Sequence, residues 1–174
     1  MFPFGHIGIT LALWVAMAYV IRHRPMKYDL WLIVFASMLP DIIDKPIGHL
    51  IFTELNDGRL VCHTLLFLIC FGLVAYILIK KRIQWAWAWP LFFGVNIHLL
   101  LDRFWEGPMA FWPMTGGFFP RGEGNILNTW IEILLHDPYV QFGEVIGLIL
   151  LVSVIIYVKL QKPAVVFTTP TLAN

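Results

Sequence analysis

Charged residues are scarce in this 174-residue chain. Asp, Glu, Lys and Arg together make up 13% of it, whereas hydrophobic residues make up 59%, and the mean hydropathy is +0.77. A soluble domain carries about 25% charged and about 45–50% apolar residues, so this balance predicts an integral membrane protein. The net charge of +1 gives no basis for nucleic-acid binding, which needs a strongly basic surface.

Cysteine is also rare. Cys62 and Cys70 form no C-x-x-C pair and lie too far apart along one predicted helix for a disulfide. We interpret both as small buried residues, and the alternative for Cys62 is a metal role, because it precedes His63. Repeats and low-complexity stretches are absent, and no Gly-Lys-Ser/Thr indicates a P-loop. We therefore expect one domain over residues 1–162 and an irregular tail over 163–174.

Long apolar segments dominate the rest of the chain. A membrane span needs about 20 apolar residues, and Asp41 and Asp44 interrupt the second candidate, which either stops inside the bilayer or continues to about Phe52 beside a wet cavity. An amphipathic helix is expected over 125–136, on the outward surface or over a site. The predicted fold class is all-α, a polytopic transmembrane helical bundle with about five membrane segments: Ile7–Ile21, Tyr28–Leu39, Thr64–Ile79, Ile83–Leu101 and Phe142–Val158.

Basic residues are distributed unevenly between these segments. Positively charged loops stay in the cytoplasm, so the more basic side is expected to be cytoplasmic, with the N-terminus outward and the C-terminus inward in an inner membrane. That side carries most of the 12 Lys and Arg, namely Arg22, Arg24, Lys27, Lys80, Lys81, Arg82, Lys159 and Lys162.

Histidines and aspartates gather at the opposite, outward ends. A rise of about 1.5 Å per residue places the ligand candidates of four segments about 20–26 Å from their cytoplasmic ends, near the edge of a hydrocarbon core about 30 Å thick. Ionisable groups at that depth are costly and need partners. Imidazoles and carboxylates together suit a zinc-type or two-metal hydrolytic site. The residues of this layer are His6, Asp41, Asp44, His49, His63, His98, Asp102 and His136, and the remaining histidine is His23.

Two pairs in this layer have helical spacing. Asp41 and Asp44 share one helix face at i, i+3, and two like charges there favour a cation between them; the alternative is a helix start with acids at the positive end of its dipole. His98 and Asp102 share a face at i, i+4, and the alternative is a hydrogen-bonded pair that locks helix packing. His6 and His63 have the alternative of simple interfacial residues.

Two arginines border this layer, and one helical pair includes its last histidine. Arg59 and Arg103 could each bind a phosphoryl oxygen or pair with Asp57 or Glu106. Glu132 and His136, four residues apart on the amphipathic helix, are interpreted as part of a solvated polar face rather than as metal ligands.

The ordered motifs resemble a known family. They are similar to the membrane-bound metal-dependent hydrolases, also described as LexA-binding, inner-membrane-associated hydrolases, over residues 5–117, where Phe111-Trp112-Pro113 also fits. Many members carry a histidine where this chain has Gly58, so either one ligand is missing or His49 takes its role. The motifs are Gly5-His6, Leu39-Pro40-Asp41-Ile42-Ile43-Asp44, Arg59-x-x-x-His63-Thr64 and His98-x-x-x-Asp102.

A weaker similarity is to zinc-dependent phospholipase C and P1-type nucleases. It implies that Asp41, His63, His98 and Asp102 hold one metal ion, and that His6 and Asp102 share a second. The later His-x-x-x-Glu motif of those enzymes is not found here, which argues against a third ion.

The expected function is that of a membrane-embedded hydrolase with one or two divalent metal ions, zinc first and manganese or magnesium as alternatives. Metal-activated water would cleave a phosphoester in a lipid or lipid-linked substrate. The expected metal ligands are His6, Asp41, His63, His98 and Asp102. Asp44 or His49 would act on the water, and Arg59 and Arg103 on the phosphate.

Two alternatives remain open. The first is a non-catalytic protein that binds or transports a divalent metal; transport predicts polar groups at several depths, whereas the sequence concentrates them at one. The second is a structural or regulatory protein in which His–Asp pairs merely tie helices together. Membrane lipids are expected partners in every case.

Overall fold

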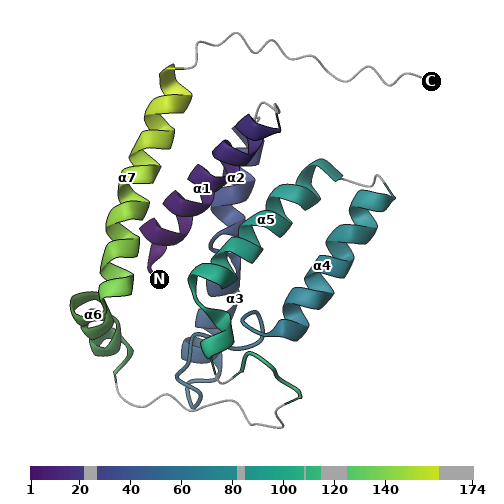
Figure 1. Ribbon diagram of the computed structural model, residues 1–174. Coiled ribbons are helices and arrows are strands. Elements are labelled where there is room, and N and C mark those ends of the chain that lie inside the picture. The colour runs from purple at the N-terminus through teal and green to yellow at the C-terminus, as the bar shows by residue number, and fades with distance from the viewer. Residues whose placement is uncertain (22–26, 82–84, 108, 115–124, 161–174) are drawn as a thin grey trace.

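The computed structural model describes residues 1–21, 27–81, 85–107, 109–114 and 125–160, and these form helices and turns without a β-strand (Figure 1). The predicted all-α class is therefore confirmed for the described residues. In chain order the helices are α1 (Pro3–Val20), α2 (Lys27–Ala36), α3 (Leu39–Pro46), the π-helical turn η1 (Ile47–Ile51), α4 (Leu65–Lys80), α5 (Trp85–Leu101), the 3-10 turn η2 (Phe104–Glu106), α6 (Ile126–His136) and α7 (Pro138–Leu160).

The helices pack so that several ends meet at one end of the bundle. Helix α1 packs along α7, and α5 packs on α2 and α4. The start of α1, the whole of α3, the start of α4 and the end of α5 lie together at the lower end of Figure 1, whereas α7 ends at the upper end. Several residues of the predicted cytoplasmic loops, Arg22, His23, Arg24, Arg82 and Lys162, lie outside the described residues, as does the tail 163–174.

The number of membrane segments differs from the prediction. Among the described helices, α1 and α7 are long and apolar enough to cross a membrane, while α4 and α5 are apolar but shorter. About five full spans are therefore not found among these helices, because the second segment is divided into α2 and α3 and because α4 and α5 are too short. Helices α4 and α7 nevertheless expose large apolar side chains, such as Leu73 and Ile149, and exposed apolar surface of this kind suits lipid better than water.

The break between α2 and α3 has a local cause. Proline has no backbone N–H and disfavours a helical residue before it, and Pro40 is tolerated at the start of α3, where no N–H partner is needed. The Ser37 hydroxyl donates to the Val34 carbonyl at 2.9 Å and is fully buried. The interruption leaves the Ser37 carbonyl outside any helix, where it is available to a side chain from another element.

Glycines bring α1 and α7 into direct backbone contact. A Cβ atom added at Gly8 would lie 1.8 Å from the Gly147 carbonyl oxygen, and one added at Gly147 would lie 2.2 Å from the Phe4 carbonyl oxygen. Small residues permit this close approach in membrane helices. The start of α1, which carries His6, is thereby held against α7.

We expect Gly8→Ala to lower the melting temperature in detergent, because backbone cannot move aside for a methyl group and overpacking costs about 1–3 kcal/mol or more. Gly72→Ala is the matched control, since its Cβ would meet the movable Phe92 ring at 3.2 Å. Equal melting temperatures for the two variants would contradict the backbone contact between α1 and α7.

Candidate metal centre

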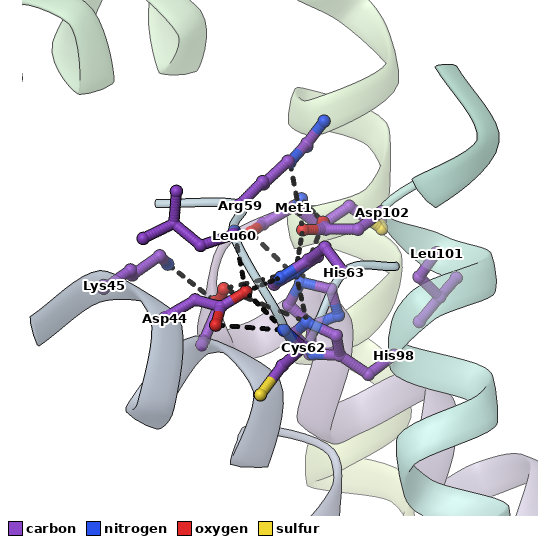
Figure 2. A network of polar contacts seen from close by, with 12 residues as sticks. Met1, Asp44, Lys45, Arg59, Leu60, Cys62, His63, His98, Leu101 and Asp102 are labelled. Carbon is purple, nitrogen blue, oxygen red and sulfur yellow. Dashed lines mark hydrogen bonds and ion pairs between the residues drawn. The ribbon is translucent and has the colours of Figure 1, made fainter. Parts of the chain in front are cut away.

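Four side chains from separate elements converge at the lower end of the bundle. Asp41 from α3, His63 from the turn before α4, His98 from α5 and Asp102 just after α5 are all buried, and one ligand atom from each lies within 4.8 Å of the others. Figure 2 shows His63, His98 and Asp102 directed toward one point. Among the described residues, this is the one such group of imidazoles and carboxylates.

Hydrogen bonds fix the orientation of the two imidazoles. His98 Nδ1 lies 2.6 Å from the Ser37 carbonyl oxygen, which can only accept, so Nδ1 carries the proton. His63 Nδ1 lies 2.8 Å from Asp44 Oδ2 and donates to that carboxylate. In their neutral forms both rings therefore turn an Nε2 lone pair inward. Outer partners of this kind orient metal-binding histidines.

The separations between these atoms suit a small cation. The two Nε2 atoms are 3.3 Å apart, and two facing lone pairs repel unless a proton or a metal ion lies between them. Zinc–nitrogen bonds of about 2.0–2.1 Å at tetrahedral angles place two ligands about 3.3–3.4 Å apart. The carboxylate oxygens lie slightly farther out, with Asp41 Oδ1 at 3.8 Å from His98 Nε2 and Asp102 Oδ2 at 3.5 Å from His63 Nε2.

The carboxylates of Asp41 and Asp102 each contact at least one positively charged group. Asp41 Oδ2 accepts from Lys45 Nζ at 2.6 Å, which leaves Oδ1 facing the imidazoles. Asp102 Oδ1 contacts the terminal ammonium of Met1 and His6 Nε2, while Oδ2 lies 3.6 Å from Arg59 Nε. These partners reduce the cost of burying the two charges, and one oxygen of each carboxylate still faces the centre.

Asp44 organises the loop that carries His63. It is fully buried and accepts from the backbone N–H groups of Leu60 and Cys62 as well as from His63. Figure 2 shows these contacts meeting on the Asp44 carboxylate. Because three donors already occupy it, Asp44 is suited to positioning His63.

The pKa shifts of His63 and Asp102, which lie just outside the helices, favour positive charge at the centre. Burial alone would lower the pKa of His63, but hydrogen bonds to Asp102 and Asp44 outweigh burial and raise it. Burial alone would raise the pKa of Asp102, but hydrogen bonds from His6 and His63 and the terminal ammonium hold it well below its usual range. Asp102 is therefore an ionised carboxylate that attracts a cation, either a proton on His63 or a metal ion.

Cys62 lies beside this centre without joining the four converging groups. Burial, followed by the negative charge of Asp44, raises the pKa of its thiol to about 12. Its place outside the four converging groups supports the interpretation of a small buried residue. Cys70 is exposed rather than buried, because it lies on the outer face of an apolar helix; the prediction that both cysteines are buried was wrong for Cys70.

His6 lies against the centre rather than within the group of four. Its Nε2 faces Asp102 Oδ1 and the Met1 carbonyl oxygen, both at 3.1 Å, and its ring stacks on His98 with centroids 4.1 Å apart. Its buried Nδ1 has no hydrogen-bond partner among the described residues. The structure thus brings His6 to the site, on the side of Asp102 away from His63.

The start of α1 is held by a residue that the sequence interpretation missed. The Glu144 carboxylate on α7 accepts from the N–H groups of Phe2, Phe4 and Gly5 at 2.9–3.1 Å. These donors have no partner within the helix, and a negative charge at a helix start is stabilising. Glu144 is the one acidic residue of α7, and an acid inside an apolar span was the available signal.

The other predicted residues lie at the edge of the centre or away from it. Arg59 borders Asp102, whereas Arg103 stacks on the Tyr139 ring at 3.8 Å and pairs with Glu106 at 3.4 Å. His49 packs against Trp130, and a Cβ added at Gly58 would lie 3.1 Å from His49 Nε2. His136 is exposed, and its imidazole contacts the Glu132 carbonyl oxygen of its own helix.

We expect Asp44→Asn to weaken binding of Zn²⁺ by about 10–100-fold, the usual effect of losing an outer partner of a metal-binding histidine. Titration of detergent-purified protein with a competing zinc chelator measures this change. Asp57→Asn is the control, because the Asp57 carboxylate accepts from the backbone N–H of Arg59 and contacts neither imidazole among the described residues. Equal zinc affinities in the two variants would show that Asp44 does not orient a metal ligand.

The comparisons with known proteins agree with the membrane character of the fold. No curated protein and no solved structure gives a significant match to the chain. A family model described as YdjM inner membrane protein matches residues 1–164, which is nearly the whole chain. Together with the apolar helices α1 and α7, this match places the protein in a membrane. The chain belongs to the YdjM inner membrane protein family.

Proposed function

We propose that this protein is a membrane-embedded, metal-dependent hydrolase that cleaves a phosphoester in a lipid or lipid-linked substrate. The observation that supports it most is the convergence of Asp41, His63, His98 and Asp102 within 4.8 Å. The outer Nδ1 atoms of both imidazoles are held by Asp44 and the Ser37 carbonyl, so the inner Nε2 atoms face each other and the two carboxylates.

The residues divide into ligands and positioning groups. Asp41, His63, His98 and Asp102 would hold one divalent ion, for which zinc fits the donor set best, with manganese or magnesium as alternatives. Such an ion supplies Lewis-acid activation of water and stabilises negative charge on phosphoryl oxygen. Asp44 and the Ser37 carbonyl orient the imidazoles. His6 supports Asp102, and His49 stays a prediction for the general base.

The residues around the centre support a phosphoester substrate at the membrane surface. The Arg59 side chain is 43% exposed with its Nε 3.6 Å from Asp102, so its guanidinium reaches both the centre and the solvent. A guanidinium binds phosphate oxygens well. The centre lies at the end of a bundle whose sides are apolar, so a lipid headgroup is the phosphate source nearest to it. We place this end on the outward side, from the basic loops at the opposite end.

A second candidate is a divalent-metal transporter, and one observation favours it. Within the described part of the chain, Thr10 and Trp14 on α1 have buried side-chain polar atoms without hydrogen-bond partners, as His6 has. The three residues are spaced four apart, so they lie on one face of the helix. Polar atoms at successive depths below the centre are what a transport path needs, whereas the sequence suggested a single layer.

We expect the wild-type protein, purified in detergent, to hold about one zinc per chain by elemental mass spectrometry, and the His98→Ala/Asp102→Ala variant to hold none. The variant should also lose hydrolysis of short-chain phospholipids and of bis(p-nitrophenyl) phosphate. His136→Ala is the control, because it removes an imidazole that points along its own exposed helix.

Three outcomes would count against this proposal. Metal and phosphoesterase activity that both persist in the double variant would refute the centre itself. Bound metal without hydrolysis, together with zinc uptake into proteoliposomes that depends on His63 and His98, would support the transporter. Full stability with no bound metal in wild-type protein would favour the structural alternative.

Arg59 and Arg103 provide a separate comparison. We expect Arg59→Ala to raise KM for a phosphoester while zinc content stays unchanged, because its guanidinium borders the centre without being a ligand. Arg103→Ala should change KM little, since that side chain is engaged by Tyr139 and Glu106. A larger effect of Arg103→Ala on KM would reverse the assignment of the phosphate-binding residue.

A further inference from the structure

Helix α6 is exposed along its whole length although most of it is apolar. None of its residues is buried, and Leu127 and Leu134 are 62% and 43% exposed. At 100° per residue, its polar residues, Asn128, Thr129, Glu132 and His136, fall within one arc of about 100°, and the apolar residues cover the rest. A two-faced helix with an open apolar side is typical of helices that lie in a membrane interface.

The attachment of α6 places it at the end of a membrane span. Gln141, in the first turn of α7, donates from its side chain to the carbonyls of Leu134 and Leu135, so α6 ends on α7. Asp137 joins the two helices and caps α7 by accepting from the Tyr139 N–H at 2.8 Å. Because α7 is a candidate span, its first turn lies at one end of that span, and Figure 1 shows α6 at this lower end of α7.

One residue of α6 connects this helix to the metal centre. The Trp130 ring lies 5.9 Å from the His49 ring, edge to face, and Lys45 Nζ is 5.6 Å from the centroid of the same indole. Lys45 also donates to Asp41, one of the four converging groups. A cation over an indole contributes about 0.5–2 kcal/mol. Trp130 therefore contacts α3 and η1 at the edge of the centre, while Leu127 and Leu134 on the same apolar side stay exposed.

We propose that α6 is an interfacial helix that binds the lipid surface beside the metal centre, with Trp130 fixing it to Lys45 and His49. The occupant of the apolar side is membrane lipid, because α6 continues directly into a span and belongs to an inner membrane protein. Indole is also the side chain that prefers the headgroup layer. A lipid headgroup held under α6 would lie next to Lys45 and Asp41. This inference does not rest on the proposed hydrolase activity.

Site-directed spin labelling in proteoliposomes tests the position of α6. The background is Cys70→Ser, since Cys70 is exposed and Cys62 is buried. Labels at Leu127→Cys and Leu134→Cys should be more accessible to oxygen, which concentrates in lipid, than to a water-soluble nickel complex. A label at Glu132→Cys on the polar arc should show the reverse. Preferential nickel access at all three positions would place α6 in water, and shielding from both reagents would indicate a protein partner; either result overturns the proposal.

The contact made by Trp130 is tested with the label at Glu132. Trp130→Ala should increase the mobility of that label, and Trp130→Phe, which keeps an aromatic ring, should restore much of the order. Leu135→Ala is the matched control, because it removes an exposed apolar side chain from the same helix. Equal mobility in the Trp130→Ala and Leu135→Ala variants would refute the role of Trp130, whatever the metal content or activity of the protein.

Discussion

Repulsion among the four converging groups of the candidate metal centre is the main physical constraint on this structure. Two imidazole nitrogens lie 3.3 Å apart with two carboxylate oxygens beside them, and all four side chains are buried. Lone pairs and negative charges in such surroundings are strongly unfavourable without a cation. The hydrogen bonds from the Ser37 carbonyl and from Asp44 hold this arrangement in place, because they engage the outer nitrogen of each ring. The centre is therefore built to receive positive charge.

Three local features of the fold produce this convergence. The interruption at Pro40 releases the Ser37 carbonyl for His98. The buried Asp44 carboxylate gathers the loop before α4 and turns His63 inward. Glycine contacts hold α1 against α7, and Glu144 of α7 accepts from N–H groups in the first turn of α1. Together these contacts bring His6 against Asp102.

A few charged residues serve many contacts in this chain, in which charged residues make up 13%. Asp102 contacts the terminal ammonium of Met1, His6 and Arg59. The Glu144 carboxylate accepts from three backbone N–H groups at the start of α1. Helix α6 is linked to the centre in the same way, since the Trp130 indole contacts Lys45, which donates to Asp41.

Much of this was decided by the sequence alone. Composition determined a membrane protein of helices, and the spacing of His98 and Asp102 determined that both project from one helix face toward the level of Asp41 and His63. Spacing could not show that the Ser37 carbonyl would hold an imidazole, because a backbone carbonyl has no side-chain signature. Spacing could not show which arginine, Arg59 or Arg103, borders the centre, because their partners Asp102 and Tyr139 lie far away in sequence. For the same reason it could not show that Asp44 positions His63. Only tertiary packing decided them, since it alone sets which groups meet across helices.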